Sequence, residues 1–172
     1  MKDETQYIEF LSELRNTLYR LALSITGNSI EAEDIVQDVF ERVWRARDRV
    51  LRSTFPRAYI CRMVHNLAID RQRTTTRRQT LSINEEMSIS RDSNNHDSDL
   101  SDMASLTRKI IASLPEKQRT VIHLRDVEGY ELEEIAEALE MDETNVRMNL
   151  SRARKSVREE LIKSMNYGVK QN

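Results

Sequence analysis

Cysteine, proline, glycine and aromatic residues are all scarce in this sequence of 172 residues. It contains one cysteine, two prolines and three glycines, and aromatic residues make up 5% of the chain. The single cysteine, Cys61, excludes an internal disulfide framework. So few aromatic side chains argue against a large β-sandwich or β-barrel core. Because glycine and proline interrupt helices, their scarcity favours helices over sheets.

Long apolar runs are missing as well. No stretch approaches the roughly 18 apolar residues of a membrane-spanning helix, so we expect no membrane insertion. The chain begins Met1-Lys2-Asp3-Glu4 without the apolar core of a signal peptide, which favours a cytoplasmic location. A glycine-rich phosphate loop, a nucleophile elbow and paired histidines are also absent. The sequence therefore predicts a protein that is not an enzyme and that needs neither a cofactor nor a metal.

Charge is unevenly distributed along a chain whose formal net charge is only −2. Residues 42–80 carry eleven basic and two acidic side chains, a net charge of +9, and residues 143–165 have a net charge of +3. The other segments are acidic, with −6 over 1–41, −5 over 81–107 and −4 over 108–142. Two basic segments separated by acidic ones predict two contacts with nucleic acid and an acidic surface for another partner. Solvated helix faces are the alternative for either segment alone.

Apolar residues recur at helical spacing in the first half of the chain. One helix is expected over 8–25, and a second follows with Ser29 as its N-cap. The pattern breaks over 50–55, and Pro56 suits the first turn of a third helix. These helices predict a first domain over 1–78.

The middle of the chain loses this periodicity. Residues 79–104 are polar and acidic, and we expect them to form a flexible linker. A second helical domain is expected over 105–165, followed by a tail over 166–172. The predicted fold class is all-α, with an N-terminal helical bundle and a C-terminal helix–turn–helix domain.

Two short helices joined by a tight turn, the second one basic, predict the helix–turn–helix. Asp142 is placed to cap the second helix. Glu140 occupies a turn position that often holds glycine, and Glu131 stands where serine or threonine would cap the first helix better. A three-helix bundle without a DNA role is the alternative, because short helical pairs are common. The expected shared core is Ile135, Ala136, Leu139, Val146 and Leu150.

The amino-acid sequences of several segments resemble those of a known protein family. Leu114–Arg125, Gly129–Ala136 and Val146–Arg154 resemble the C-terminal domain of sigma-70-family transcription initiation factors, most closely the short extracytoplasmic-function (ECF) type. In the first half, Ala32–Phe40 is similar to that family's polymerase-binding helix, and Ala58–Arg71 to its helix for the melted promoter element. The motifs follow one another in the family's order, with the acidic segment between them.

The resemblance implies an RNA polymerase sigma factor of the ECF type. Such a factor binds the clamp helices and flap of core RNA polymerase and directs transcription initiation at promoter DNA. It reads the −35 element as duplex and the −10 element as melted DNA, and an anti-sigma factor is a further candidate partner. Tyr59 stands where the family often has tryptophan, and residues 50–55 lack a common glycine, so the resemblance implies no particular base preference.

The resemblance also implies three sets of contact residues. The polymerase-binding set contains Glu33, Asp34, Gln37, Asp38 and Glu41. Within it, Asp34, Gln37 and Asp38 share one face of a helix by their spacing. The set for melted −10 DNA is Leu51, Ser53, Thr54, Phe55, Tyr59, Arg62, Asn66, Asp70, Arg71 and Arg73. Within it, the candidates for a pocket that holds an extruded base are Leu51, Ser53, Thr54, Phe55 and Asn66. The set for −35 duplex is Arg125, Asn145, Arg147, Met148, Ser151, Arg152, Arg154 and Lys155.

Two other functions stay open at this point. A stand-alone helix–turn–helix regulator with a helical sensor or dimerisation domain would carry the same C-terminal motif, and a protein-interaction adaptor would use the helices without DNA. Binding to core polymerase separates the sigma factor from both, and a dimer on a palindromic site would favour the regulator. Cys61 and His65 have the helical spacing of two metal ligands, but a packed thiol is the preferred interpretation because no further cysteine exists.

Overall fold

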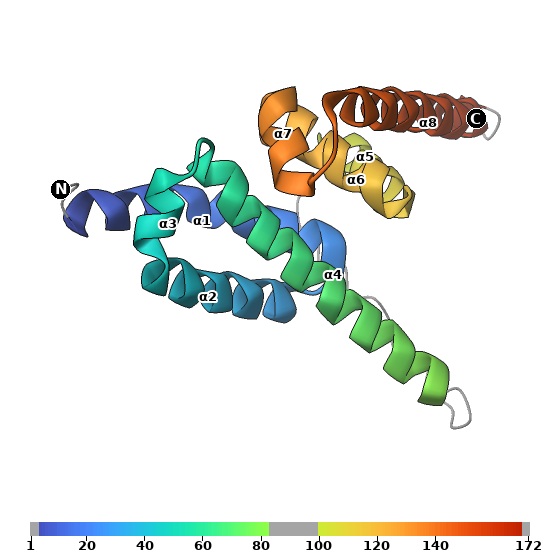
Figure 1. Ribbon diagram of the computed structural model, residues 1–172. Helices are drawn as coiled ribbons and strands as arrows, with labels where there is room; N and C mark the ends of the chain where they lie inside the picture. The colour runs from blue at the N-terminus through green and yellow to red at the C-terminus, as the bar shows by residue number, and fades with distance from the viewer. Residues whose placement is uncertain (1–3, 83–99, 170–172) are drawn as a thin grey trace. The chain divides into compact units, whose positions relative to one another are not determined.

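The computed structural model describes residues 4–82 and 100–169, and all the secondary structure in these ranges is helical (Figure 1). Contacts between helices divide the chain into two compact units. The first contains α1 (Glu4–Thr26), α2 (Ser29–Arg45), α3 (Arg47–Arg52) and α4 (Pro56–Ser82). The second contains α5 (Leu100–Ser113), α6 (Glu116–Ile122), the π-helical turn η1 (His123–Val127), most of α7 (Leu132–Leu139), and α8 (Glu143–Val169). The predicted all-α fold with two helical domains is confirmed.

The core of the first unit lies where α1, α2 and α4 pack against one another, and α3 packs on α4. Apolar residues at helical spacing give each long helix one buried face. Burial of a large aliphatic side chain contributes roughly 1.5–3 kcal/mol, so these faces hold the bundle together. The large apolar side chains with almost no exposure are Leu14, Leu18, Leu21, Ile25, Ile35, Val39, Val43, Val50, Ile60 and Val64.

The junction between α1 and α2 depends on two adjacent residues. Gly27 has a φ of +68°, a left-handed conformation that glycine adopts without a steric penalty. Asn28 then caps α2, because its Oδ1 accepts hydrogen bonds from the backbone N–H groups of Ile30 at 2.9 Å and Glu31 at 3.1 Å. The prediction that Ser29 is the N-cap is therefore wrong by one residue.

The end of α2 leads directly into α3, a helix that the sequence pattern did not indicate. The hydroxyl of Tyr7 donates to the backbone carbonyl of Val43 at 3.1 Å, near the last turn of α2. The six residues of α3 bury a single side chain, Val50, so they show no apolar period. The break in the helical pattern expected over 50–55 is confined to residues 53–55, between α3 and α4. Pro56 begins α4 as predicted.

Three helix ends differ from the predicted domain limits. The helix α4 continues to Ser82 and α5 begins at Leu100, so both extend into the expected linker over 79–104. The expected tail over 166–172 is helical as far as Val169. The remaining residues of the predicted flexible linker, 83–99, lie outside the described residues.

In the second unit, α6 and α5 pack on α8 and on each other. Of the expected shared core, Ile135, Val146 and Leu150 are buried, while Ala136 and Leu139 are half-buried. Further buried side chains come from α6, η1 and α8: Val121, Ile122, Leu124 and Ala153. None of the helices in the described part of the chain is long and apolar enough to cross a membrane.

The turn between α7 and α8 has the hydrogen bonds of a Schellman motif. The N–H of Met141 donates to the carbonyl of Ala136 at 2.9 Å, and the N–H of Glu140 lies 3.4 Å from the carbonyl of Glu137. Glu140 has a φ of +52°, in the left-handed region that favours glycine. A bulky residue thus occupies the position where the sequence pattern suggested glycine, at a cost in backbone strain.

Candidate functional site

The acidic face of α2 lies opposite the face that this helix buries in the core. Its buried positions are Ala32, Ile35, Val36, Val39 and Val43. Asp38 is half-buried, and the other four predicted docking residues are exposed: Glu33, Asp34, Gln37 and Glu41. Glu41 forms an exposed ion pair with Arg45, one turn further along the helix. The face therefore presents carboxylates and one amide for contact with a partner.

Arg71 of α4 joins this acidic face to the basic helix beside it. Its Nη2 donates to Oδ2 of Asp38 at 2.7 Å, and its Nη1 lies 3.9 Å from Oδ2 of Asp34. The resemblance implies that the two aspartates contact polymerase and that the arginine contacts DNA. In the structure the three side chains form one ion-pair cluster.

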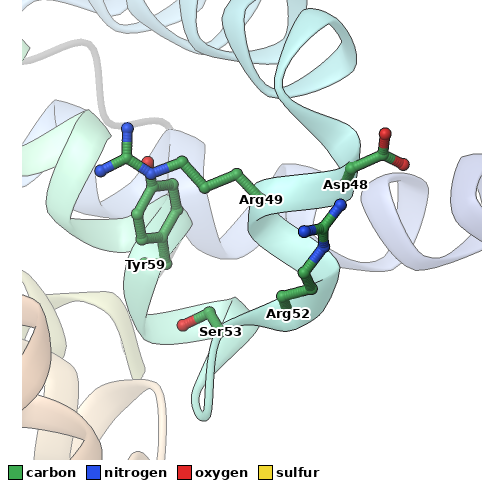
Figure 2. Close-up of a pocket in the computed structure, with 5 residues that line it drawn as sticks. All are labelled: Asp48, Arg49, Arg52, Ser53 and Tyr59. Carbon is green, nitrogen blue, oxygen red and sulfur yellow. The ribbon is translucent and has the colours of Figure 1, made fainter.

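A pocket of about 460 Å³ opens between α3 and the first turns of α4 (Figure 2). The residues that line it are Asp48, Arg49, Arg52, Ser53 and Tyr59. The guanidinium carbons of Arg49 and Arg62 lie 6.0 and 5.2 Å from the centroid of the Tyr59 ring, within cation–π range. The pocket thus combines the ring of Tyr59 with the guanidinium groups of Arg49 and Arg52 and the carboxylate of Asp48.

This pocket overlaps only in part with the one expected from the sequence. Of the expected pocket residues, Ser53 lines it, while Leu51, Thr54 and Asn66 are exposed elsewhere and Phe55 is half-buried. Asp48, Arg49 and Arg52 are not among the predicted pocket residues, because the apolar pattern of the sequence does not indicate the helix α3. The signal that could have found them is the basic composition of residues 42–80.

Beyond the pocket, α4 presents predicted DNA-binding residues at helical spacing. Arg62, Asn66 and Asp70 follow one another at intervals of four, so they share one side of the helix. Asn66 and Asp70 are exposed, and Asn66 Oδ1 lies 3.3 Å from Nδ1 of His65. Arg73 is exposed on the part of α4 that follows.

The N-terminus of α8 is closed by Asp142, as predicted. Its Oδ1 accepts a hydrogen bond from the backbone N–H of Asn145 at 2.8 Å, and its Oδ2 accepts one from the side-chain amide of Asn145. The backbone hydrogen bond is the main cause that lowers the pKa of the Asp142 carboxyl below its ordinary value. Asn145, predicted to contact DNA, is thereby part of the cap.

Past this cap, α8 exposes most of the side chains predicted to contact −35 DNA. Arg147 is exposed and pairs with Glu143, one turn earlier, at 3.0 Å. Met148, Ser151 and Arg152 are exposed on the following turn. Lys155 is also exposed and lies 3.9 Å from Glu159. The exposed face of α8 thus combines cations with small polar and apolar groups, as base-edge recognition requires.

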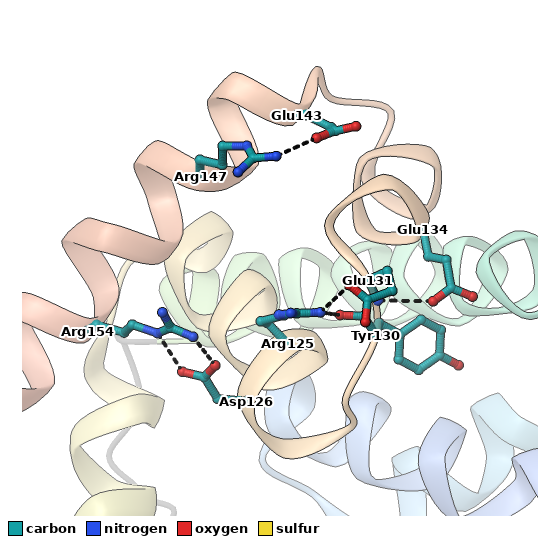
Figure 3. A network of polar contacts seen from close by, with 8 residues as sticks. All are labelled: Arg125, Asp126, Tyr130, Glu131, Glu134, Glu143, Arg147 and Arg154. Carbon is teal, nitrogen blue, oxygen red and sulfur yellow. Dashed lines mark hydrogen bonds and ion pairs between the residues drawn. The ribbon is translucent and has the colours of Figure 1, made fainter.

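Two other arginines of the predicted −35 set are held by acids of their own unit (Figure 3). Arg154 donates through Nε and Nη2 to the two carboxylate oxygens of Asp126 at 3.0 and 2.6 Å, a bidentate pair between α8 and η1. The hydrogen bond to Asp126 raises the pKa of Arg154 above its ordinary value. Arg125 donates to the carbonyl of Tyr130 at 2.7 Å and to Glu131 at 2.8 Å. Both guanidinium groups therefore connect parts of the same unit.

The same network closes the start of α7. Oε2 of Glu134 accepts a hydrogen bond from the backbone N–H of Glu131 at 3.0 Å, which is one half of a capping box. The carboxylate of Glu131 is turned to Arg125 instead of the helix. This explains how a residue that is a poor N-cap by type can stand at this position.

In the comparison with known protein families, each of the two units matches a different family model. The family model described as Sigma-70 region 2 matches residues 10–78, and the one described as Sigma-70, region 4 matches residues 105–157. The first match covers the acidic face of α2 and the α3–α4 pocket, and the second covers the helix–turn–helix. Together they account for more than half of the chain.

Relatives and a solved structure agree with these matches. The ECF RNA polymerase sigma factor SigE of Mycolicibacterium smegmatis is 32% identical over 161 residues, which are 90% of this chain but only 61% of that protein, less than two thirds of its length. The ECF RNA polymerase sigma factor SigW of Bacillus subtilis is 25% identical over 171 residues, 92% of this chain and 90% of the relative. The crystal structure of the sigma factor RpoE with the anti-sigma factor NepR, from Bartonella quintana, has the same fold, with a TM-score of 0.73 at 23% identity over 91% of this chain and 96% of that one. The chain therefore belongs to the sigma-70 family, in which it groups with the ECF members.

Proposed function

We propose that this protein is an RNA polymerase sigma factor of the ECF type, which binds core RNA polymerase and directs it to promoters. The observation that carries the proposal is the presence of both sigma-70 regions, in order, on two units with different exposed surfaces. In this function the chain is not an enzyme: it positions polymerase on DNA and captures a strand, and the cytoplasm is its expected location.

The proposed division of labour follows the predicted domains. Residues 1–78 dock on polymerase and hold −10 DNA, residues 105–165 bind −35 DNA, residues 79–104 connect them, and 166–172 form a tail. The acidic face of α2 supplies the docking contact with the clamp helices through Glu33, Asp34, Gln37, Asp38 and Glu41. The second unit would contact the flap.

We assign the capture of melted −10 DNA to the α3–α4 pocket. Turning a base out of the stack costs a few kcal/mol, which stacking and hydrogen bonds in a pocket must offset. Tyr59 offers the stacking face, Ser53 a hydrogen-bonding group, and Arg49 and Arg52 charge for the flanking phosphates. This proposal adds Asp48, Arg49 and Arg52 to the predicted −10 set, while Leu51, Thr54, Phe55 and Asn66 lie outside the pocket lining.

We assign −35 recognition to the exposed face of α8. A recognition helix places its N-terminal residues against base edges in the major groove. Arg147 and Arg152 are the candidates for bidentate bonds to guanine, and Met148 offers an apolar contact to a thymine methyl group. Lys155 is suited to a phosphate, while Arg125, Arg154 and Asn145 support the helix through contacts within the unit.

An anti-sigma factor is a further proposed partner. The solved structures similar to this chain include the sigma factor RpoE bound to the anti-sigma factor NepR, and CnrH bound to the cytosolic domain of CnrY. A partner of this kind would compete with polymerase for the exposed helical surfaces.

The test is run-off transcription with purified core polymerase on a library of promoter sequences. Core polymerase with this protein should produce transcripts from a subset that shares −35 and −10 motifs, whereas core polymerase alone should not. The control is the Asp34→Ala, Gln37→Ala, Asp38→Ala triple variant, which should fold normally by circular dichroism and fail to support transcription. Specific, dimeric binding of the free protein to a palindrome without any effect on core polymerase would instead favour the stand-alone regulator.

A further inference from the structure

Arg71 faces the polymerase-docking side of its unit although the sequence places it among DNA-binding residues. Its hydrogen bond to Asp38 measures 2.7 Å, and its side chain is 33% exposed, against 44% for Asp38 and 57% for Asp34. The guanidinium group is therefore committed to the acidic face of α2. Oδ2 of Asp38 receives this bond, and Oδ1 forms no hydrogen bond within the described residues.

The next arginine along α4 shows the contrast. Two residues on a helix are separated by about 200° around its axis, so Arg73 points away from the side that Arg71 occupies. Arg73 and Arg77, four residues apart on one face, are both exposed and form no ion pair within the described part of the chain. Phosphate contacts from this helix therefore belong to the face of Arg73 and Arg77.

A carboxylate that binds a partner binds more tightly when a neighbouring side chain already holds it in one conformation. An exposed acidic side chain must be ordered when a partner binds, and this ordering opposes association. Arg71 orders Asp38 in advance by a charge-assisted hydrogen bond between α4 and α2, and its second nitrogen extends toward Asp34. The ion pair also joins the docking helix α2 to the helix that carries Tyr59 of the pocket.

We propose that Arg71 is a positioning residue of the polymerase-docking face and not a DNA contact. This inference rests on the proposed function, since it assumes that the acidic face of α2 binds core polymerase. Arg71 acts through Asp38, so removing either side chain removes the same contribution to docking.

The first experiment measures the affinity of labelled full-length protein for core polymerase. Arg71→Ala should weaken binding by roughly threefold to tenfold, the range for one partly exposed charged hydrogen bond. Arg71→Ala with Asp38→Ala should bind no more weakly than Asp38→Ala alone, because the two act as a unit. Arg71→Lys, which keeps the charge, should recover part of the loss, and Arg73→Ala is the matched control that should bind normally. Circular dichroism establishes that each variant is folded.

The second experiment measures binding of melted −10 DNA by holoenzyme formed at saturating protein, over a range of salt concentrations. Arg71→Ala should leave the affinity and the salt dependence unchanged, whereas Arg73→Ala should reduce the slope of log K against log salt by about 0.7, one phosphate contact to single-stranded DNA. Normal core binding by Arg71→Ala, or effects of Arg71→Ala and Asp38→Ala that simply add, would overturn the inference. A loss of one phosphate contact in Arg71→Ala would overturn it as well. If the Asp34, Gln37 and Asp38 triple variant binds core polymerase normally, the docking proposal itself fails; if only Arg71→Ala binds normally, the role of Arg71 alone fails.

Discussion

At the scale of single residues, Tyr7 shows how one side chain can close a helix end. Its hydroxyl donates to the carbonyl of Val43, one of the last carbonyls of α2, which have no partner within the helix. Tyr7→Phe keeps the ring and removes this bond. The free energy of unfolding should fall by about 1 kcal/mol, the usual worth of such a hydrogen bond. Chemical denaturation checks the value, and Tyr19→Phe in the same helix, whose hydroxyl makes no hydrogen bond within the described residues, should change little.

The same tyrosine predicts a dependence on alkaline pH. Burial raises the pKa of Tyr7, while the nearby charge of Arg47 lowers it to a smaller extent. Because the folded state holds the phenol proton more tightly than the unfolded state, this contribution is complete below the ordinary tyrosine pKa of about 10 and is lost as pH rises through the higher folded value. The free energy of unfolding of Tyr7→Phe should therefore decrease less between neutral and alkaline pH than that of the unmodified protein, as measured by chemical denaturation at each pH.

At the scale of elements, the turn of the helix–turn–helix carries measurable strain. Glu140 adopts a φ of +52° at the position that closes α7. Glu140→Gly should raise the free energy of unfolding by roughly 0.5–1 kcal/mol, because glycine adopts this conformation without a steric penalty. Thermal and chemical denaturation measure the change. The matched control is Glu137→Gly in the last turn of α7, where the backbone is helical and the same replacement should lower the free energy of unfolding by up to about 1 kcal/mol. Destabilisation at both positions would contradict the strain at Glu140.

The elements also show what the sequence could and could not reveal. Long amphipathic helices were predictable, because Leu14, Leu18 and Leu21 repeat at helical spacing and are all buried. The short helix α3 was not, since only Val50 among its six residues is buried. The N-cap was displaced by one residue because Asn28 and Ser29 are both good capping residues and sequence alone does not choose between them.

The candidate site was predictable in composition but not in pairing. The basic residues of a segment can be counted in the sequence. The acidic residue with which each arginine forms an ion pair depends on tertiary packing. Arg154 finds Asp126, 28 positions away in the chain, and Arg71 finds Asp38, 33 positions away. Partners that distant leave no local pattern, so the sequence assigned both arginines to DNA.

This pairing predicts different behaviour for two arginines of α8. Arg152 is exposed and forms no ion pair within the described residues, while Arg154 is bidentate with Asp126. On a −35 duplex, Arg152→Ala should cost roughly 1–3 kcal/mol if it reads a base, or reduce the salt slope by about one unit if it contacts a phosphate. Arg154→Ala should leave the salt slope of DNA binding unchanged and should instead lower the free energy of unfolding. A double-mutant cycle with Asp126→Ala should give a coupling energy of about 1 kcal/mol for this partly exposed pair. A slope reduced by one unit in Arg154→Ala would show that it exchanges Asp126 for a phosphate.

At the scale of the whole molecule, the basic side chains are divided between two units and partly neutralised within them. The formal net charge of the chain is −2, and Arg71, Arg125 and Arg154 all pair with acids of their own unit. The remaining cations belong to a chain in which 29 acidic side chains outnumber 27 basic ones, so acidic segments oppose the approach of phosphates to both units. Since phosphate contacts supply most of the sequence-independent affinity for DNA, the free protein has a weak electrostatic basis for binding duplex.

We therefore expect the free protein to bind promoter duplex weakly and core polymerase tightly, and the holoenzyme to bind the promoter tightly. Each unit contributes a small surface, and polymerase adds its own contacts while it holds both units on one DNA molecule, which raises their effective concentration for each other. Gel shifts at a fixed salt concentration should compare free protein, core polymerase and holoenzyme on the same promoter fragment. The Asp34, Gln37 and Asp38 triple variant is the control, because it should lose the gain in the presence of core polymerase without altering the weak binding of the free protein. Tight, sequence-specific binding of a dimer without polymerase would contradict this expectation and would favour the stand-alone regulator.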